Sequence, residues 1–121
     1  MTYRLLLGCT GEYLAGQYLE EMGYKILNKN WRFQKAEIDI IAYKDKQIIF
    51  VEVKSRSGCT FGQPEDFVNL TKQKTLERAA EEYIYIMNHQ GEIRFDIISI
   101  LFDSSGNHSL RHIEDAFWPE V

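Results

Sequence analysis

The hydrophobic pattern of the first half of the chain predicts one helix followed by three strands. After Thr10, a candidate N-cap, apolar residues recur at helical spacing until Gly23 interrupts the pattern. The residues that follow form β-branched and aromatic runs separated by short polar turns, which is typical of antiparallel strands joined in a meander. These runs cover residues 25–33, 37–43 and 47–54.

The second half of the chain predicts another helix and a fourth strand. From Thr71 one helical face is apolar, and its members are Leu76, Ala79, Ala80, Tyr83 and Met87. Residues 92–102 are again β-branched, and a parallel pairing with an earlier strand is one arrangement open to them. Residues 55–70 read as a loop, and the tail around Ile113 either adds an edge strand or packs against the fold. This order favours one mixed sheet flanked by helices, within a single domain of residues 1–121.

Two of the predicted strands carry charged residues where a buried strand is usually apolar. In the earlier strand, alternation puts Glu37, Asp39 and Ile41 on one face. In the later strand Glu52 and Lys54 share a face, and pairing through the short turn puts Asp39 nearly opposite Glu52. Carboxylates that face each other in a sheet repel, and an unpaired buried charge is costly, so the pair needs compensation.

Two arrangements would compensate this repulsion, and the residues alone leave both open. Lys54 could neutralise Glu52 in a structural ion pair, which explains the charges without any chemistry. Alternatively, a divalent cation could bind, because paired carboxylates and a backbone carbonyl are the hard oxygen ligands that Mg²⁺ and Mn²⁺ prefer. Lys54 could then stabilise developing negative charge or hold an attacking water, as phosphoryl chemistry requires.

Several sequence motifs resemble those of a known family. "EID", followed after a strand and a turn by "VEVKSR", resembles the signature of the PD-(D/E)xK nuclease superfamily. With "GEYLAGQYLEEMGYKILNKNWR", "AEIDIIA", "IIFVEVKSR", "FGQPEDFV" and "RFDIISI", the chain resembles the YraN-like uncharacterised protein family, which is similar to the archaeal Holliday junction resolvases. The resemblance spans residues 8–100, with Ala36 where the family usually has glycine.

The resemblance implies an α/β, restriction-endonuclease-like fold in which a mixed β-sheet is flanked by helices. It implies a metal-dependent endonuclease that hydrolyses phosphodiesters of structured or branched DNA, with catalytic roles for Glu12, Asp39, Glu52 and Lys54. Mg²⁺ or Mn²⁺ would be held by Asp39, Glu52 and the backbone carbonyl of Val53. For Glu12 the helix dipole offers another explanation, since an acid in the first turn is favourable without catalysis. The alternative function is a non-catalytic nucleic-acid or protein binding module that retains the nuclease fold.

The charge balance restricts how DNA could bind. The formal net charge of −4 gives no general attraction for a polyanion, so nucleic acid would need a local basic surface. The best local set of basic residues is Arg56, Lys72, Lys74 and Arg78. A homodimer is also expected, because two active sites related by two-fold symmetry are the simplest way to cut two related strands.

Composition and cysteine usage favour a soluble cytoplasmic protein with no membrane partner. The chain is 45% hydrophobic and 26% charged, and none of its apolar runs approaches the length of a membrane span. The three leucines before Cys9 are too few for a signal peptide. Cys9 and Cys59 lack the spacing of a zinc or redox site, so reduced thiols are expected. The three histidines show no metal-ligand spacing either.

Overall fold

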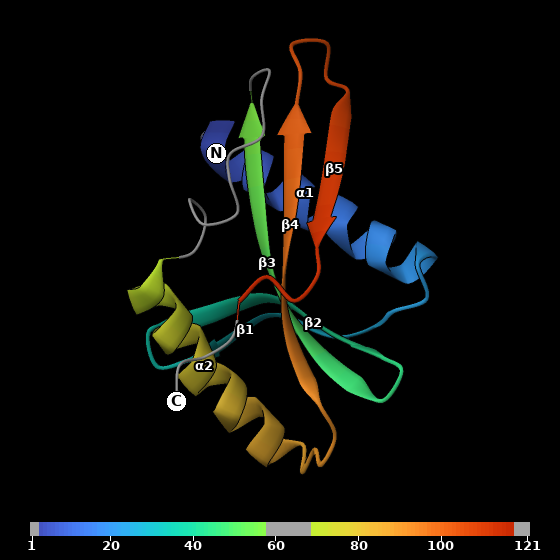
Figure 1. The fold of residues 1–121 in the computed structure, drawn as a ribbon. Coiled ribbons are helices and arrows are strands. Elements are labelled where there is room, and N and C mark those ends of the chain that lie inside the picture. Colours follow the sequence, from blue (N-terminus) through green and yellow to red (C-terminus); the bar gives the residue numbers. More distant parts are fainter. Residues whose placement is uncertain (1–2, 58–68, 118–121) are drawn as a thin grey trace.

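The computed structural model describes residues 3–57 and 69–117, with side chains from Thr10 onward. Five strands form one sheet in the order β1-β2-β3-β4-β5, and the two helices lie on opposite sides of it (Figure 1). The elements are α1 (Tyr3–Glu21), β1 (Lys25–Phe33), β2 (Ala36–Lys44), β3 (Gln47–Ser57), α2 (Leu70–Ile86), β4 (Ile93–Phe102) and β5 (His108–Ile113). The predicted α/β fold, in which one mixed sheet is flanked by helices, is confirmed.

The connections between strands explain the sheet topology. Two-residue turns join β1 to β2 and β2 to β3, so these neighbours pair antiparallel. β3 and β4 pair in parallel from Ile48 and Ile93 to Ser57 and Phe102, and a parallel pair needs a long crossover, which includes α2. The parallel pairing that the sequence left open is therefore confirmed. Of the two arrangements considered for the tail, the structure has the edge strand, because β5 pairs antiparallel with β4.

The sheet has an apolar core on each face. Ala15 and Leu19 of α1 pack against a group from the strands that includes Ile49 and Val51 of β3. On the opposite face, α2 packs against Phe50 of β3 and its neighbours; the buried residues of α2 are Leu76, Ala79, Ala80 and Tyr83. Because β3 is covered on both faces, its sequence is a continuous apolar run, as expected for a central strand.

Two boundary predictions are wrong. α1 begins at Tyr3, seven residues before the expected N-cap, so Thr10 lies inside the helix and Glu12 lies well beyond the first turn. The helix-dipole explanation of Glu12 therefore fails, since that effect is confined to the terminal turns. At the other helix, Met87 is the C-cap and is half-exposed rather than part of the buried face. Helix ends depend on packing and capping that apolar spacing does not encode.

A fully buried carboxylate, Asp96 of β4, is held by a dense set of hydrogen bonds. Arg94 donates from Nε to Oδ1 and from Nη2 to Oδ2, both at 2.8 Å. His112 Nε2 lies 2.7 Å from Oδ2, and the N–H of Asp115 donates to Oδ1 at 3.0 Å. Burial acts to raise the pKa of Asp96, but the hydrogen bonds from His112 and Arg94 outweigh it and lower the pKa.

This cluster ties four parts of the fold together. Tyr18 of α1 lies with its hydroxyl 3.0 Å from Nδ1 of His112, and Arg94 Nη2 donates to the hydroxyl of Tyr24 at 2.7 Å. Asp96 thus connects α1, the start of β1, the edge strand β5 and the segment that follows it. The role of His112 in the structure is to complete this buried network.

Neither described helix combines the length and the apolar character that crossing a membrane requires.

Cys59 and the "FGQPEDFV" motif fall within residues 58–68, which lie outside the described residues, as does the side chain of Cys9. The prediction of reduced thiols therefore stays a prediction.

Candidate metal centre

Asp39 lies where β2 departs from regular strand geometry. Ile38 packs in the core on the α2 side and Ile40 in the core on the α1 side, although regular alternation would put both on one face. The pairing of β2 with β3 has the predicted register, but at this end its last pair is Ile40 with Val51. Beyond that pair, Oδ2 of Asp39 accepts a hydrogen bond from the N–H of Val53 at 2.8 Å.

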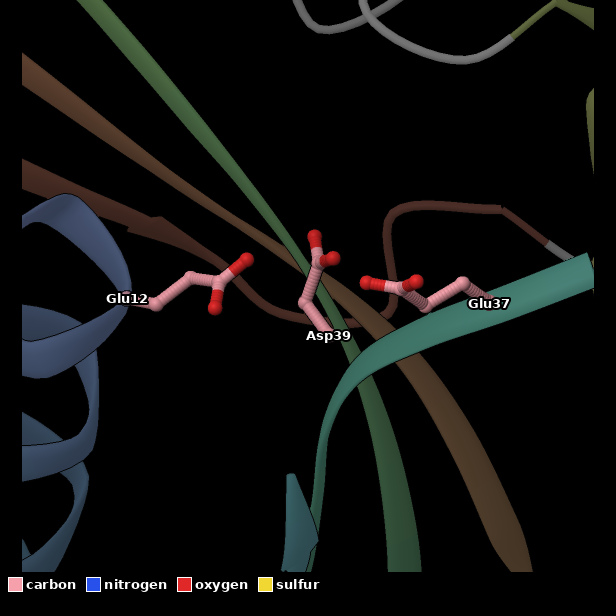
Figure 2. Close-up of side chains that lie close together, drawn as sticks. All are labelled: Glu12, Glu37 and Asp39. Atoms are coloured by element: carbon pink, nitrogen blue, oxygen red, sulfur yellow. The ribbon is translucent and has the colours of Figure 1, made fainter. Parts of the chain in front are cut away.

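This irregularity changes which residues share a face. The prediction that Ile41 shares a face with Glu37 and Asp39 is wrong, because Ile41 packs in the core on the α2 side. The two acids instead turn toward Glu12 of α1 (Figure 2). On the neighbouring strand Asn30, which precedes the partner of Ile38, has a left-handed φ of 53°. Asparagine tolerates this conformation better than most residues, so both strands accommodate the bend.

Three carboxylates meet at the bend. One oxygen from each of Glu12, Glu37 and Asp39 lies within 4.8 Å of the other two. Figure 2 shows Asp39 between the other two side chains, one from α1 and one from β2. With its amide nitrogen turned toward them, Asn30 donates to Glu12 and Glu37 at 3.1 Å each. Arg32 balances part of this charge, since its Nη2 lies 2.8 Å from Oε2 of Glu37, but the amide of Asn30 is neutral. The cluster therefore keeps negative charge and is a candidate for binding a cation.

A glycine allows α1 to approach the sheet closely enough for Glu12 to reach this cluster. A Cβ at Gly11 would lie 1.8 Å from Oγ of Ser55 on β3, which is far inside van der Waals contact. Any larger residue would therefore require the hydroxyl of Ser55 to rotate away and would crowd Cβ of Ser55, which lies at 3.1 Å. The position of the Glu12 carboxylate in the cluster depends on this close approach of α1 to β3.

The like charges perturb the protonation of Asp39. Burial, the largest cause, and the charges of Glu52 and Glu12 raise the pKa of Asp39 from 3.8 to about 8. The hydrogen bond from Val53 and the charge of Lys72 act in the opposite direction but do not offset this effect. A carboxyl with such a pKa is readily protonated near neutral pH, and a bound cation would favour its charged form.

Glu52 of β3 faces α2 and contacts two lysines. Its side chain is only 7% exposed, and its Oε1 lies 2.8 Å from Nζ of Lys72 and 3.7 Å from Nζ of Lys54. Burial and the charge of Lys72 lower the pKa of Lys54. The nearest cation to Glu52 is therefore the lysine of α2, although the sequence pointed to the lysine two residues away on the same strand.

Three further basic side chains, those of Lys35, Lys74 and Arg78, line an open groove. Between the β1–β2 turn and α2 lies a groove with a volume of about 610 Å³; its lining includes Lys35, Thr71, Lys74, Thr75 and Arg78. A neighbouring hollow of about 350 Å³ shares several of these residues and extends to Glu37 and Lys72. The two hollows therefore place exposed basic side chains next to Glu37 and Lys72.

The structure brings together the four residues for which the sequence implied catalytic roles. The charge of Glu52 acts on the pKa of Glu12, Asp39 and Lys54, and the charge of Glu12 also acts on the pKa of Asp39. The described contact of Val53 with Asp39 is through its backbone N–H, and a role for its carbonyl stays a prediction.

The predicted DNA contacts are spread over two places. Lys74 and Arg78 line the groove, whereas Arg56 lies near the exposed end of β3. The side chain of Lys72 contacts Glu52.

Sequence reasoning missed the parts played by three residues of this site. Glu37 was noted for its face but not as a site residue, although its position two residues before Asp39 was the available signal. For Asn30 and for the contact of Lys72 with Glu52 there was no such signal, because each depends on elements far apart in the sequence. Such contacts follow from tertiary packing alone.

Fold and site together define an α/β protein with a mixed sheet between two helices and an acidic cluster at the end of the β2–β3 ladder. The chain belongs to the uncharacterised protein family UPF0102, whose family model matches residues 11–100. The matched segment contains all four carboxylates and both lysines of the site.

Relatives from several bacteria support this membership. The UPF0102 protein of Flavobacterium psychrophilum is 46% identical over 112 residues, which is 93% of each chain. That of Bacteroides thetaiotaomicron is 44% identical over 115 residues, covering 95% of this chain and 94% of the relative. Among solved structures, Pyrococcus furiosus SfsA in complex with Ca²⁺ is similar over 92% of this chain and 63% of its own, with 17% identity and a TM-score of 0.38.

Proposed function

We propose that this protein is a metal-dependent endonuclease that hydrolyses phosphodiester bonds in structured or branched DNA. The observation that carries the proposal is the convergence of four carboxylates and two lysines where β2 and β3 diverge; they are Glu12, Glu37, Asp39, Glu52, Lys54 and Lys72. Phosphoryl transfer needs this combination, because anionic ligands hold a metal and cationic groups stabilise negative charge on the reacting phosphate.

The donor set fits Mg²⁺ or Mn²⁺. All the side-chain donors are carboxylate oxygens, which hard divalent cations prefer, and no described histidine or cysteine lies in the cluster. Asp39 and Glu52 would hold the ion with the carbonyl of Val53, while Glu12 and Glu37 would bind it directly or through water. When bound, such an ion stabilises charge on phosphoryl oxygens and favours the ionisation of water.

The residues of the chain have separate tasks in this proposal. The N–H of Val53 fixes the orientation of the Asp39 carboxylate. Lys54, at the side of Glu52, would stabilise the negative charge that develops on the phosphate or orient the attacking water. The groove lined by Lys74 and Arg78 would hold the DNA backbone on the approach to the acids.

Asp39→Asn is the variant that tests the function. We expect wild-type protein with Mg²⁺ or Mn²⁺ to nick a four-way junction, and Asp39→Asn to bind no Mn²⁺ and to leave the junction intact. Calorimetry and gel assays measure these two properties. Asp45→Asn is the matched control, since it makes the same chemical change in the exposed β2–β3 turn and should behave as wild type. Equal Mn²⁺ binding by wild type and Asp39→Asn, with no cleavage of junction, flap or single-stranded DNA, would refute the proposal.

The pH dependence gives the same experiment a second readout. Because the pKa of Asp39 in the folded chain is raised to about 8 from 3.8, ionising this group destabilises the fold. Without metal, the stability of the wild type should therefore fall as pH rises from 3.8 toward about 8, and Asp39→Asn should lack this part of the fall. Mn²⁺ affinity should rise over the same range, since the ion must displace the proton.

A role of the groove in DNA binding predicts how the DNA affinity depends on salt concentration. Changing Lys74 and Arg78 to Glu should weaken DNA binding across all sequences, because these residues would contact phosphates rather than bases. The slope of log affinity against log salt should become shallower by roughly 0.9 for each lost phosphate contact on duplex DNA. Fluorescence anisotropy at several salt concentrations measures the slope. An unchanged slope would indicate that DNA binds at another surface of the protein.

One observation favours the alternative function, a non-catalytic nucleic-acid or protein binding module. Lys72 and Lys54 together can neutralise Glu52 without a metal, as in a purely structural ion-pair network. A module of this kind would bind DNA or a protein equally well with and without divalent ions. The calorimetric comparison of wild type with Asp39→Asn distinguishes the two functions.

A further inference from the structure

Lys72 is placed at the start of α2 by a well-defined cap. The side chain of Asn69 accepts a hydrogen bond from the backbone N–H of Lys72 at 2.9 Å, so the position of its Cα is fixed. From there the side chain reaches across to β3, where Nζ lies 2.8 Å from Oε1 of Glu52. The ammonium of Lys72 is therefore bound to an oxygen of Glu52, which is one of the proposed metal ligands.

Electrostatic repulsion opposes an arrangement in which a divalent cation and both lysine ammonium groups contact the carboxylate of Glu52. Lys54 and Lys72 already share one oxygen, since Oε1 of Glu52 lies 3.7 Å from Nζ of Lys54 and 2.8 Å from Nζ of Lys72. A bound ion adds two further positive charges, and like charges at short range in a half-buried site repel strongly. One ammonium must therefore move away when the ion binds.

The structure favours Lys72 as the group that moves. Lys54 lies on the same strand as Glu52 and is the less exposed of the two, at 31% against 37%. Lys72 also lines the hollow of about 350 Å³ that it shares with Lys35, Asn69, Thr71 and Thr75. By rotation of its own side chain, the ammonium could turn from Glu52 into that hollow, which continues into the groove.

We propose that Lys72 is a substrate-contacting residue that Glu52 holds until a divalent cation takes its place, after which the released ammonium contacts a phosphate of the DNA. This inference rests on the proposed function and gives Lys72 a role there that changes when the metal binds. Lys72 then has two alternating partners, a carboxylate and a phosphate. Metal binding and DNA binding are linked because both depend on its release.

Mn²⁺ affinity tests the first half of this inference without any cleavage. If Lys72 competes with the ion for Glu52, Lys72→Met should bind Mn²⁺ more tightly than the wild type, on the order of tenfold. Lys25→Met is the matched control, because it removes the same charge from an exposed position at the start of β1, and its affinity should equal that of the wild type. Lys72→Arg keeps the ion pair and should show no gain.

DNA affinity tests the second half. In Ca²⁺, used here as a non-cleaving ion, the wild type should bind a four-way junction more tightly than it does without divalent ions. Lys72→Met should lose most of that ion-dependent gain, whereas Lys72→Arg should keep it because guanidinium also contacts phosphate.

Two results would overturn the inference. One is Mn²⁺ affinity of Lys72→Met no higher than that of Lys25→Met, and the other is an undiminished ion-dependent gain in the DNA affinity of Lys72→Met. If either occurs while Asp39→Asn still abolishes Mn²⁺ binding and cleavage, only the role of Lys72 fails and the proposed endonuclease stands. Loss of Mn²⁺ binding by Lys72→Met, with its fold intact by circular dichroism, would likewise count against competition.

Discussion

Lys54→Ala is expected to keep the fold and the Mn²⁺ affinity while slowing cleavage of branched DNA by about 10²–10³-fold, the usual scale for losing one charge-stabilising group. The fold should tolerate the change because Lys72, at 2.8 Å, remains paired with Glu52. The measurements are thermal unfolding, calorimetry with Mn²⁺, and nicking of a four-way junction. Lys25→Ala, which removes an exposed charge at the start of β1, is the control and should match the wild type.

The structural alternative predicts a different outcome for the same variant. If Lys54 serves only to neutralise Glu52, its loss should cost about 3–5 kcal/mol of stability, and adding Glu52→Gln should restore much of it. Severe destabilisation rescued in this double variant, together with no nicking by wild type on any branched or single-stranded substrate, would defeat the enzymatic interpretation. The fold would then have kept its ion pair for structure.

Asp96→Ala is expected to cost about 3–5 kcal/mol of the free energy of unfolding, because it leaves the guanidinium of Arg94 and a buried histidine without their shared partner. Urea denaturation at pH 7 measures the loss. The exposed acid Glu81 of α2 provides the control, and its change to Ala should alter stability by less than about 0.5 kcal/mol. A loss for Asp96→Ala as small as that of the control would show that the cluster does not hold the fold together.

The pKa of Asp96 adds a pH dependence to this prediction. Its folded pKa lies below the ordinary value of 3.8, so the carboxylate contributes stability that is fully present above that value. That contribution is lost as pH falls through the folded pKa. The difference in stability between wild type and Asp96→Asn should therefore be constant near neutral pH and should shrink in acid.

Apolar periodicity was enough to predict most of the fold. The run "IIFV" in β3 has apolar residues in both alternating sets, and the structure buries it under α1 and α2. The polar turns marked the ends of the first three strands to within a few residues. The start of α1 was missed, because Thr10 looks like a cap locally although the helix continues through it.

The site was predictable only as far as it follows from a single strand or hairpin. Glu52 and Lys54 share a face of β3, and both contact α2 or its lysine as their alternation implies. Ile41 was wrongly assigned to the face of Asp39, because the bend in β2 reverses the alternation that the prediction assumed. Bends of this kind depend on the partner strand, where Asn30 adopts its left-handed conformation.

The sequence pattern did not predict hydrogen bonds between segments that are distant in the chain. His112 looked unremarkable in the sequence because it has no metal-ligand spacing, yet it contacts a carboxylate sixteen residues earlier and a tyrosine of α1. Likewise Lys72 and Glu52 lie twenty residues apart and meet across two layers of the fold. Pairs of this kind can be recognised only when the layers are assembled.

The divergence of β2 from β3 beyond Ile40 and Val51 gives the two helices a common point of contact with the site. α1 contributes Glu12 from one side of the sheet, and α2 contributes Lys72 from the other (Figure 1). An ion held in this opening would tie α1 to the sheet through Glu12, while release of Lys72 from Glu52 would remove a contact of α2. Its binding should therefore slow amide hydrogen exchange in α1, including turns that lie far from any ligand, without slowing it in α2.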